Sequence, residues 1–332
     1  MTAMSIPPLA IPDHRTMLAA MRLASRAPSV HNTQPWRWVF DGTKLHLHAD
    51  TDRLLTAADP QGRQLIISCG AMLHHVRTAF GARGWHTDTL REPDPLNPGH
   101  LAEISFRPWP TPPAGLVARA GVIDLRRTDR LPFEAPRDWN ALLPRLRMLV
   151  SPHYLDLVTL DEKIRPRLTA ASEQATALRR HDMMYQAEIG WWAGHSGDSE
   201  GVPREALISD SESARVGVGR TFPSAPHSAR RTGLEDHASL VVLSSEGDSV
   251  TEWLRTGEAL SAVLLECTVA GLATCPLTHI TELPTGRNLL TGLVADRGKP
   301  QLMIRIGVAP DSGDTAPTPR RPLTDILTLI RE

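Results

Sequence analysis

Two stretches of this 332-residue sequence carry side chains suited to binding a polar ligand. The first runs from Pro28 to Trp36 (PSVHNTQPW) and offers the hydroxyl of Ser29 and the amides of Asn32 and Gln34. These groups both donate and accept hydrogen bonds, so the set suits the edge of a flat heterocycle. It suits a phosphate less well, because the stretch has no glycine run and no lysine. The alternative is a surface turn whose Ser and Asn side chains bond to its own backbone.

The second stretch, Val122–Phe133 (VIDLRRTDRLPF), is dense in arginine. It places three guanidinium groups and a hydroxyl within five residues, at Arg126, Arg127, Thr128 and Arg130. Arginine forks match phosphate oxygens, so this stretch predicts an anion site. The alternative is a solvated charge run, partly neutralised by Asp129. A second basic turn, with Arg320 and Arg321, lies near the end of the sequence.

The elements around these stretches alternate between helix and strand. Apolar residues recur at helical spacing over Thr16–Arg26, Pro28 ends that helix, and Trp36–Phe40 is rich in strand formers. Further on, Ala238–Leu243 predicts a buried strand, Ser249–Leu272 a long helix, and Gln301–Val308 a central strand, with the helix broken at Cys275–His279. This order predicts an α+β protein with mixed or antiparallel sheets flanked by helices.

The two halves of the chain run in a similar order. Each has an Ala-rich helix followed by a strand, with Arg63–Arg83 and Leu101–Phe106 in the first half. We therefore predict two diverged, fused halves, 1–114 and 115–332, joined at the Pro-rich run Trp109–Ala114. The polar segment 195–231 is too long for an ordinary loop and predicts a lid, a binding loop or disorder.

Composition excludes several function classes. The formal net charge of −1 gives no electrostatic case for nucleic acid or an anionic membrane surface. Three scattered cysteines give no disulfide framework, and no signal peptide or membrane span is evident, so we expect a cytoplasmic protein. His46 and His48 share one strand face, but the sequence places no third ligand beside them, so no metal site is predicted.

Taken together, these motifs resemble the nitroreductase family of FMN-binding flavoproteins. PSVHNTQPW resembles the family's PSSxNxQPW turn, and RRTDRLPF resembles its RRSxRxF opening. The run ending in GLATCPLT resembles the helix and turn under the flavin, and QLMIRIGVA followed by PRRPL resembles the closing strand and basic turn. These pieces span most of the chain, and the nearest likeness is to the mycobacterial Acg-like NAD(P)H nitroreductases.

The resemblance implies a nitroreductase-like fold and a set of cofactor-binding residues. Arg126, Arg127, Thr128 and Arg130 match the positions that hold the FMN phosphate and flavin edge, and Arg320 and Arg321 match a second phosphate clamp. The turn residues Pro28, Ser29, Asn32 and Gln34 match the opposite wall, with Val30 where the family often has serine. The turn beside the reactive flavin nitrogen N5 is matched by Pro276, Leu277 and Thr278.

The same resemblance implies one FMN per chain. The first half has the Pro28–Trp36 turn without an arginine motif, and the second half has the arginine motifs without that turn. We therefore expect a monomer that mimics the family dimer. NAD(P)H would reduce the flavin and a nitroaromatic or quinone would reoxidise it, with no protein nucleophile. The alternative is an FMN storage or sequestration protein whose 195–231 lid excludes nicotinamide.

Overall fold

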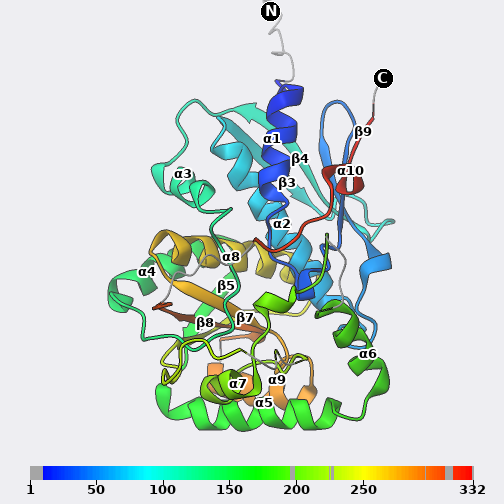
Figure 1. Ribbon diagram of the computed structural model, residues 1–332. Coiled ribbons are helices and arrows are strands. Elements are labelled where there is room, and N and C mark those ends of the chain that lie inside the picture. Colours follow the sequence, from blue (N-terminus) through cyan, green and yellow to red (C-terminus); the bar gives the residue numbers. More distant parts are fainter. Residues whose placement is uncertain are drawn as a thin grey trace, which may run out of the picture.

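The computed structural model describes residues 10–194, 199–223, 225, 228–295, 297–310 and 317–330. Two β-sheets are stacked along the molecule, with a pair of helices between them (Figure 1). The expectation of an α+β protein with mixed and antiparallel sheets flanked by helices is confirmed.

Sheet A has the strand order β3-β4-β2-β1-β9. Its strands are β1 (Trp36–Phe40), β2 (Leu45–Ala49), β3 (Trp85–Arg91), β4 (His100–Pro108) and β9 (Leu327–Leu329). Neighbours are antiparallel, except that β9 pairs with β1 in parallel. The last described residues of the chain therefore complete a sheet that is otherwise built from its first third.

Sheet B is antiparallel, with the order β5-β6-β8-β7. Its strands are β5 (Leu155–Thr159), β6 (Ser239–Ser245), β7 (Ala273–Leu277) and β8 (Lys299–Gly307). When the strands of sheet B are numbered by their order in the chain, they lie side by side as first, second, fourth and third. The strands β1, β2, β4 and β3 of sheet A lie side by side in the same way. The repeated order is the structural counterpart of the similar order seen in the sequence.

Two long helices, α2 (Arg63–Gly81) and α8 (Val250–Val269), cross at the centre of the molecule. At the crossing the backbones come so close that a Cβ atom on Gly257 would lie 1.9 Å from the carbonyl oxygen of Ile67. Glycine is required there because no side chain fits.

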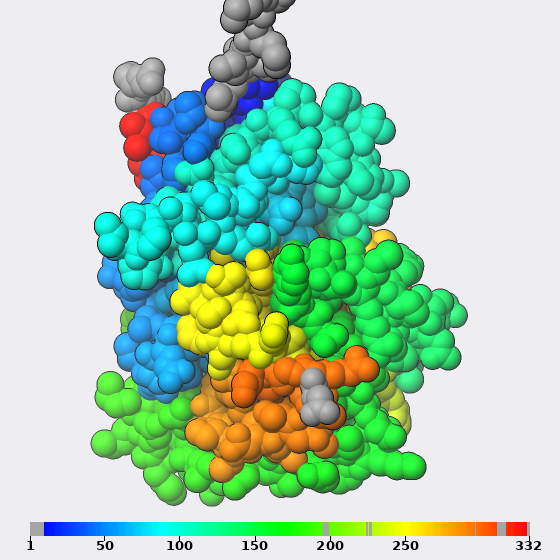
Figure 2. Space-filling model, turned by 180° about the vertical axis from the view of Figure 1, so that it is seen from behind, coloured from blue at the N-terminus to red at the C-terminus, as the bar shows by residue number. Residues whose placement is uncertain are grey.

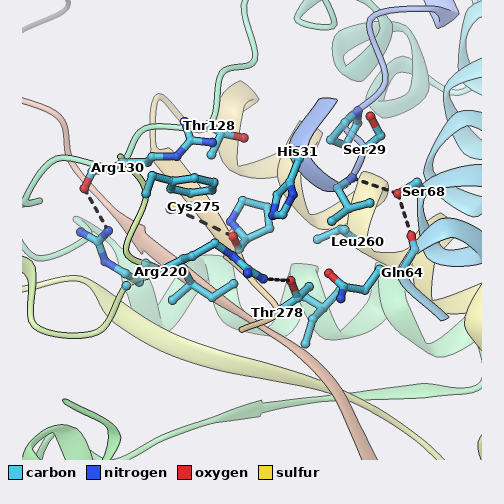
Figure 3. A pocket seen from close by; sticks show the side chains of 18 of the residues that line it. Ser29, His31, Gln64, Ser68, Thr128, Arg130, Arg220, Leu260, Cys275 and Thr278 are labelled. Atoms are coloured by element: carbon cyan, nitrogen blue, oxygen red, sulfur yellow. Dashed lines mark hydrogen bonds between the residues drawn. The ribbon is translucent and has the colours of Figure 1, made fainter. Parts of the chain in front are cut away.

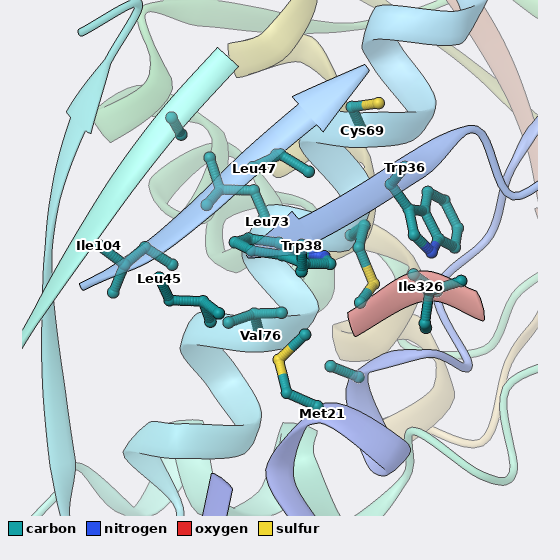
Figure 4. Close-up of a cluster of buried hydrophobic side chains, with 14 of the residues drawn as sticks. Met21, Trp36, Trp38, Leu45, Leu47, Cys69, Leu73, Val76, Ile104 and Ile326 are labelled. Atoms are coloured by element: carbon teal, nitrogen blue, oxygen red, sulfur yellow. The ribbon is translucent and has the colours of Figure 1, made fainter. Parts of the chain in front are cut away.

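Sheet A is buried on one face and sheet B on both. Trp36 and Trp38 alternate with the exposed Arg37 along β1 and pack toward α2 with Leu73 (Figure 4). Sheet B has α8 on one face and α5 (Arg165–Arg179) and α9 (Pro284–Val294) on the other. This explains why nearly every residue of β6 and β8 is buried.

The remaining helices cover the edges of this frame. They are α1 (His14–Ala24), α3 (Ala114–Gly121), α4 (Trp139–Val150), α6 (Met183–Trp192), α7 (Asp210–Val216) and α10 (Leu323–Ile326). Seen from behind, blue and cyan residues of the first half lie above the orange residues of the second half (Figure 2). Because α3 contacts both α2 and α8, the chain passes from one half to the other along the central helices.

Candidate functional site

A cavity lies between the N-terminal part of α2, the middle of α8 and strand β7 (Figure 3). It encloses about 970 Å³, counting the part open to solvent. We call it the inner cavity. The predicted site residues that line it are Pro28, Ser29, Thr128, Arg130, Pro276, Leu277 and Thr278.

The turn after α1 forms one wall of the inner cavity. Ser29 Oγ accepts a hydrogen bond from the Gln34 backbone N–H at 3.0 Å, and Ser68 Oγ of α2 accepts one from the Val30 N–H at 3.0 Å. His31, Asn32 and Gln34 all have positive φ angles of 46°, 58° and 51°. Ser29 thus bonds to the backbone of its own turn, as the alternative interpretation expected, but His31, Asn32 and Gln34 are buried, so this is not a surface turn.

Asn32 and Gln34 do not line the inner cavity. Asn32 Nδ2 donates to the carbonyl oxygens of Gly201 (2.9 Å) and Pro319 (3.0 Å). Gln34 Nε2 donates to the Ser199 carbonyl at 2.9 Å, and its Oε1 accepts from the Arg321 N–H at 2.8 Å. Both amides therefore tie the turn to the polar segment and to the basic turn near the end of the chain. Their contact with a cofactor stays a prediction.

His31 lines the cavity, although the sequence analysis did not select it. It is buried, and neither of its ring nitrogens has a hydrogen-bond partner among the described residues. Burial, helped by the nearby Arg220 cation, lowers its pKa to about 3, so the imidazole is neutral at pH 7. Phe222 packs edge-on against this ring at 5.5 Å between centroids.

The opposite wall combines the arginine motif with strand β7. The two segments are joined by a parallel bridge between Thr128 and Thr274, and the Asp129 N–H donates to the Thr274 carbonyl at 3.0 Å. Pro276, within β7, and Thr278, directly after it, line the cavity. Burial lowers the pKa of Arg130, which faces the same space (Figure 3).

Beside the inner cavity lies a cluster of four arginines, Arg26, Arg126, Arg127 and Arg320. Arg126 is buried, and its Nε and Nη1 atoms have no partner among the described residues. Burial, followed by the charges of Arg127 and Arg26, lowers its pKa to about 10. In the described part of the chain, one carboxylate is ion-paired with the cluster, that of Asp124, 3.7 Å from Arg26.

Arg320 and Arg321, although adjacent in the sequence, contact different parts of the structure. Arg320 donates to the backbone carbonyls of Ser25 and Arg26, both at 2.9 Å, and burial together with the other arginines of the cluster lowers its pKa strongly. Arg321 instead donates to the Gln34 carbonyl at 3.0 Å and to Asp50 at 3.2 Å. The structure therefore places Arg320 in the four-arginine cluster and Arg321 in a contact with the first half.

The polar segment 195–231 covers the inner cavity. Residues 195–198, 224, 226 and 227 of this predicted lid lie outside the described residues. The rest is anchored by ion pairs, including Arg53 with Glu200 and, at 2.7 Å, Arg231 with Asp129.

Arg220 is another anchor of this segment. Its guanidinium donates to the Tyr185 hydroxyl (2.6 Å) and to Thr278 Oγ1 (3.1 Å), and it is ion-paired with Glu282. Burial opposes the charge on Arg220, but the Glu282 carboxylate raises the pKa of Arg220 above its ordinary value. Burial likewise opposes the charge on Glu282, but Arg220 lowers the pKa of that carboxyl to about 2. Both partners therefore stay charged at neutral pH.

Two further features of the sequence are placed by the structure. His46 Nδ1 lies 3.1 Å from Nε2 of His100, and the His48 ring stacks on His100. Even so, the described residues contain no group of three His, Cys, Asp or Glu side chains arranged to hold a metal ion. Among the helices of the described residues, none has the length and apolar character needed to cross a membrane.

Comparison with known proteins places the chain in a family. No family model matches the sequence. The chain is 45% identical to protein Rv3127 of Mycobacterium tuberculosis (strain ATCC 25618 / H37Rv) over 316 residues, covering 93% of this chain and 92% of that protein. It is 44% identical over 310 residues to the protein of the same strain named "Putative NAD(P)H nitroreductase acg", covering 93% of this chain and 94% of that protein.

Among solved structures, the FMN-dependent nitroreductase NfnB of Mycobacterium smegmatis, in complex with NADPH, matches with a TM-score of 0.40 and 17% identity. The match covers 64% of this chain and 98% of NfnB. The assignment rests on the sequence relatives, because they match over nearly their whole length. The chain therefore belongs to the nitroreductase family, in the branch that contains Acg, and the predicted resemblance is confirmed.

Proposed function

We propose that the chain binds one FMN with its ring system in the inner cavity and its phosphate at the four-arginine cluster. On this proposal it is an NAD(P)H-dependent oxidoreductase that acts on small nitroaromatic or quinone acceptors. Family membership supports the class of reaction, since the relative Acg is named for NAD(P)H nitroreduction. The site itself supports the cofactor.

The single observation that carries the proposal is that the guanidinium group of Arg126 is buried without enough hydrogen-bond partners. A buried guanidinium with two unpartnered nitrogens, among three further arginines, is costly unless an anion completes it. A phosphate monoester supplies the charge and the acceptor oxygens that the cluster lacks. Arg26, Arg126, Arg127 and Arg320 would hold it.

The inner cavity has the walls that a flat, partly polar ring needs. Its apolar lining includes Leu260, Leu277 and Pro28, while Ser29 and Thr278 supply hydroxyl groups. When bound, FMN supplies hydride transfer, and the protein supplies binding, orientation and charge. The Arg130 cation, which lines the same cavity, would stabilise negative charge that develops on a ligand there.

The described residues that line the cavity offer no activated nucleophile for this reaction. Cys275 lines the cavity, but burial raises the pKa of its thiol, so it stays protonated at neutral pH. His31 is the titratable side chain best placed to exchange a hydrogen bond with a bound substrate, since its two ring nitrogens are unpartnered among the described residues. We therefore assign it a binding role toward the substrate.

A second candidate function is FMN sequestration with little turnover. It is favoured by the packing of the 195–231 segment, whose Arg220 and Phe222 cover the inner cavity and are held by buried contacts. Nicotinamide would reach a flavin under this cover only after the segment moves.

We also propose that the protein acts as a monomer in the cytoplasm, with one site per chain. The proposal is supported by the way the two fused halves share one site. The turn at Pro28–His31 comes from the first half, and Thr128, Arg130 and Pro276 come from the second.

The test is to purify the chain, release and quantify its flavin, and add NADPH without oxygen. About one FMN per chain and rapid loss of the visible flavin absorbance are the results expected for the reductase. A flavin that stays oxidised with NADPH but is reduced by dithionite would favour sequestration. A colourless chain that takes up no FMN would overturn both.

A further inference from the structure

We propose that a second cavity, on the far side of Arg220 and Phe222, is an outer chamber that captures aromatic compounds bearing a carboxylate or phosphate. On this view the two side chains form a gate between the outer chamber and the inner cavity. The inference rests on the proposed function, because it gives a flavin in the inner cavity a route to its substrates.

The two cavities are separated by very little protein. The outer chamber lies between α5, α6 and the turn before α9, and Arg220 and Phe222 line both it and the inner cavity. Its other lining residues belong to the C-terminal end of α5, to α6, to the covering segment and to the turn before α9, and they include Arg179, Arg180, Tyr185, His279 and Leu283. A molecule in the outer chamber would therefore be separated from the inner cavity by the gate alone.

The lining of the outer chamber combines aromatic and cationic groups. Tyr185 and Phe222 offer ring faces, and Ile189 and Leu283 extend the apolar wall. Planar aromatic ligands gain contact area on such surfaces. The volume of the chamber, about 480 Å³, accommodates a substituted aromatic ring.

Charge then selects among aromatic ligands. Arg179, Arg180 and Arg220 line the chamber, while Glu282 balances Arg220 and Asp182 contacts Arg179 at 2.8 Å. Three cations against two carboxylates leave one positive charge in excess.

Two buried nitrogens of the lining residues lack a hydrogen-bond partner within the part of the chain that the structure describes. Arg179 Nε has no partner among the described residues, and neither does His279 Nδ1, whose side chain is more than nine-tenths buried. His279 Nε2 is fixed by Ser172 Oγ at 2.9 Å, which orients the ring. The excess positive charge of the lining favours an anionic ligand.

The gate has one rigid and one movable member. Arg220 is held by Tyr185, Thr278 and Glu282, so it stays in place. Phe222 is half-buried and is held by ring contacts with His31 and with the Arg130 guanidinium, 5.1 Å from the ring centroid. Displacing Phe222 breaks no hydrogen bond of its side chain, so we assign the opening motion to this residue.

The experiment compares two probes of nearly equal shape, 4-nitrobenzoate and the neutral 4-nitrobenzyl alcohol. Binding to the full chain is measured by equilibrium dialysis. We expect 4-nitrobenzoate to bind at least threefold more tightly, and the double variant Arg179→Gln/Arg180→Gln to remove the preference. Arg167→Gln is the matched control, because Arg167 is exposed on the same helix and lies outside the chamber.

The gate is tested on the flavin-loaded chain by stopped-flow measurement of the change in the flavin spectrum when 4-nitrobenzoate is added. Phe222→Ala should raise the rate constant at least fivefold. Trp191→Ala, an aromatic deletion at an exposed position of α6 outside the chamber, should leave it unchanged.

The proposed role of the outer chamber would be overturned if the two probes bound equally. It would also be overturned if the double variant and Arg167→Gln had equal effects on the preference for 4-nitrobenzoate. An unchanged rate constant in Phe222→Ala would overturn the gate. If the chain binds no flavin, the proposed function is wrong. The dialysis experiment would still test ligand binding in the outer chamber, since it needs no flavin.

Discussion

Gly70 of α2 and Gly257 of α8 face each other where the two central helices cross. A Cβ atom on Gly70 would lie 3.0 Å from the Cα atom of Gly257 and 1.9 Å from the carbonyl oxygen of Leu254. Because the obstacles are backbone atoms, they cannot move aside without separating the helices. The inner cavity is lined by both helices, so this contact also sets its width.

The first prediction concerns this crossing. Gly257→Ala should lower the free energy of unfolding by about 1–3 kcal/mol, because the added methyl group forces α2 and α8 apart. The measurement is denaturant unfolding followed by circular dichroism. Gly292→Ala is the control, since no atom lies within 4 Å of a Cβ at this position in α9, and it should be neutral or mildly stabilising. Equal effects of the two variants would contradict the prediction.

The four-arginine cluster predicts opposite effects on stability and on cofactor binding. Arg126→Met should weaken FMN binding at least tenfold. It should also stabilise the flavin-free chain by about 1 kcal/mol, because a buried, unpartnered cation is replaced by an apolar side chain.

FMN titration and unfolding of the flavin-free form measure the two effects of Arg126→Met. Arg22→Met, at an exposed position of α1, should change neither quantity. If Arg126→Met lowers stability and leaves FMN binding intact, the phosphate site has been misplaced.

Buried histidines predict that stability falls in mild acid. Burial lowers the pKa of His31, His75 and His279 to about 3, whereas an unfolded chain takes up these protons near the ordinary value of 6.5. Above pH 6.5 these histidines leave the free energy of unfolding unchanged. As the pH falls below 6.5, each histidine lowers the free energy of unfolding by up to about 1.4 kcal/mol per pH unit.

The free energy of unfolding between pH 7.5 and 4.5 tests this. His31→Gln should reduce the slope of the free energy of unfolding against pH by the contribution of one histidine. His181→Gln, at an exposed position, should leave this slope unchanged. A flat profile would show that these histidines are accessible to protons in the native state.

The buried pair of Arg220 and Glu282 predicts how firmly the covering segment is held. Glu282→Gln leaves the Arg220 cation buried without its carboxylate, so the segment should open more often. Trypsin should then cleave at arginines of residues 199–223 several times faster than in the native chain. Glu246→Gln, at an exposed position, is the control. Unchanged cleavage would mean that other contacts hold the segment.

The spacing of apolar residues predicted most of the helices and strands correctly. The strand predicted over Trp36–Phe40 is β1, and the long helix predicted over Ser249–Leu272 is α8, Val250–Val269. Strand β7 was missed, because Pro276 argues against a strand. In the structure β7 is the edge strand of sheet B, where proline is tolerated.

The candidate site was predictable in its parts but not in its assembly. The turn beginning at Pro28 and the arginine motif both reach the site, as their residue types suggested. His31 gave no signal, because its burial depends on Phe222, far away in the sequence. Arg220 was hidden in a polar segment, and only the fold brings it to Glu282 and Thr278.

The strand pairing of β9 with β1 has a consequence for how the protein is made. Arg320, which belongs to the four-arginine cluster, precedes β9 and is fastened to the carbonyls that end α1. During synthesis the cluster therefore stays incomplete until almost the whole of this sequence has left the ribosome. A chain cut short before Arg320 would lack one of the four arginines proposed to hold the FMN phosphate, so it should retain the cofactor less firmly.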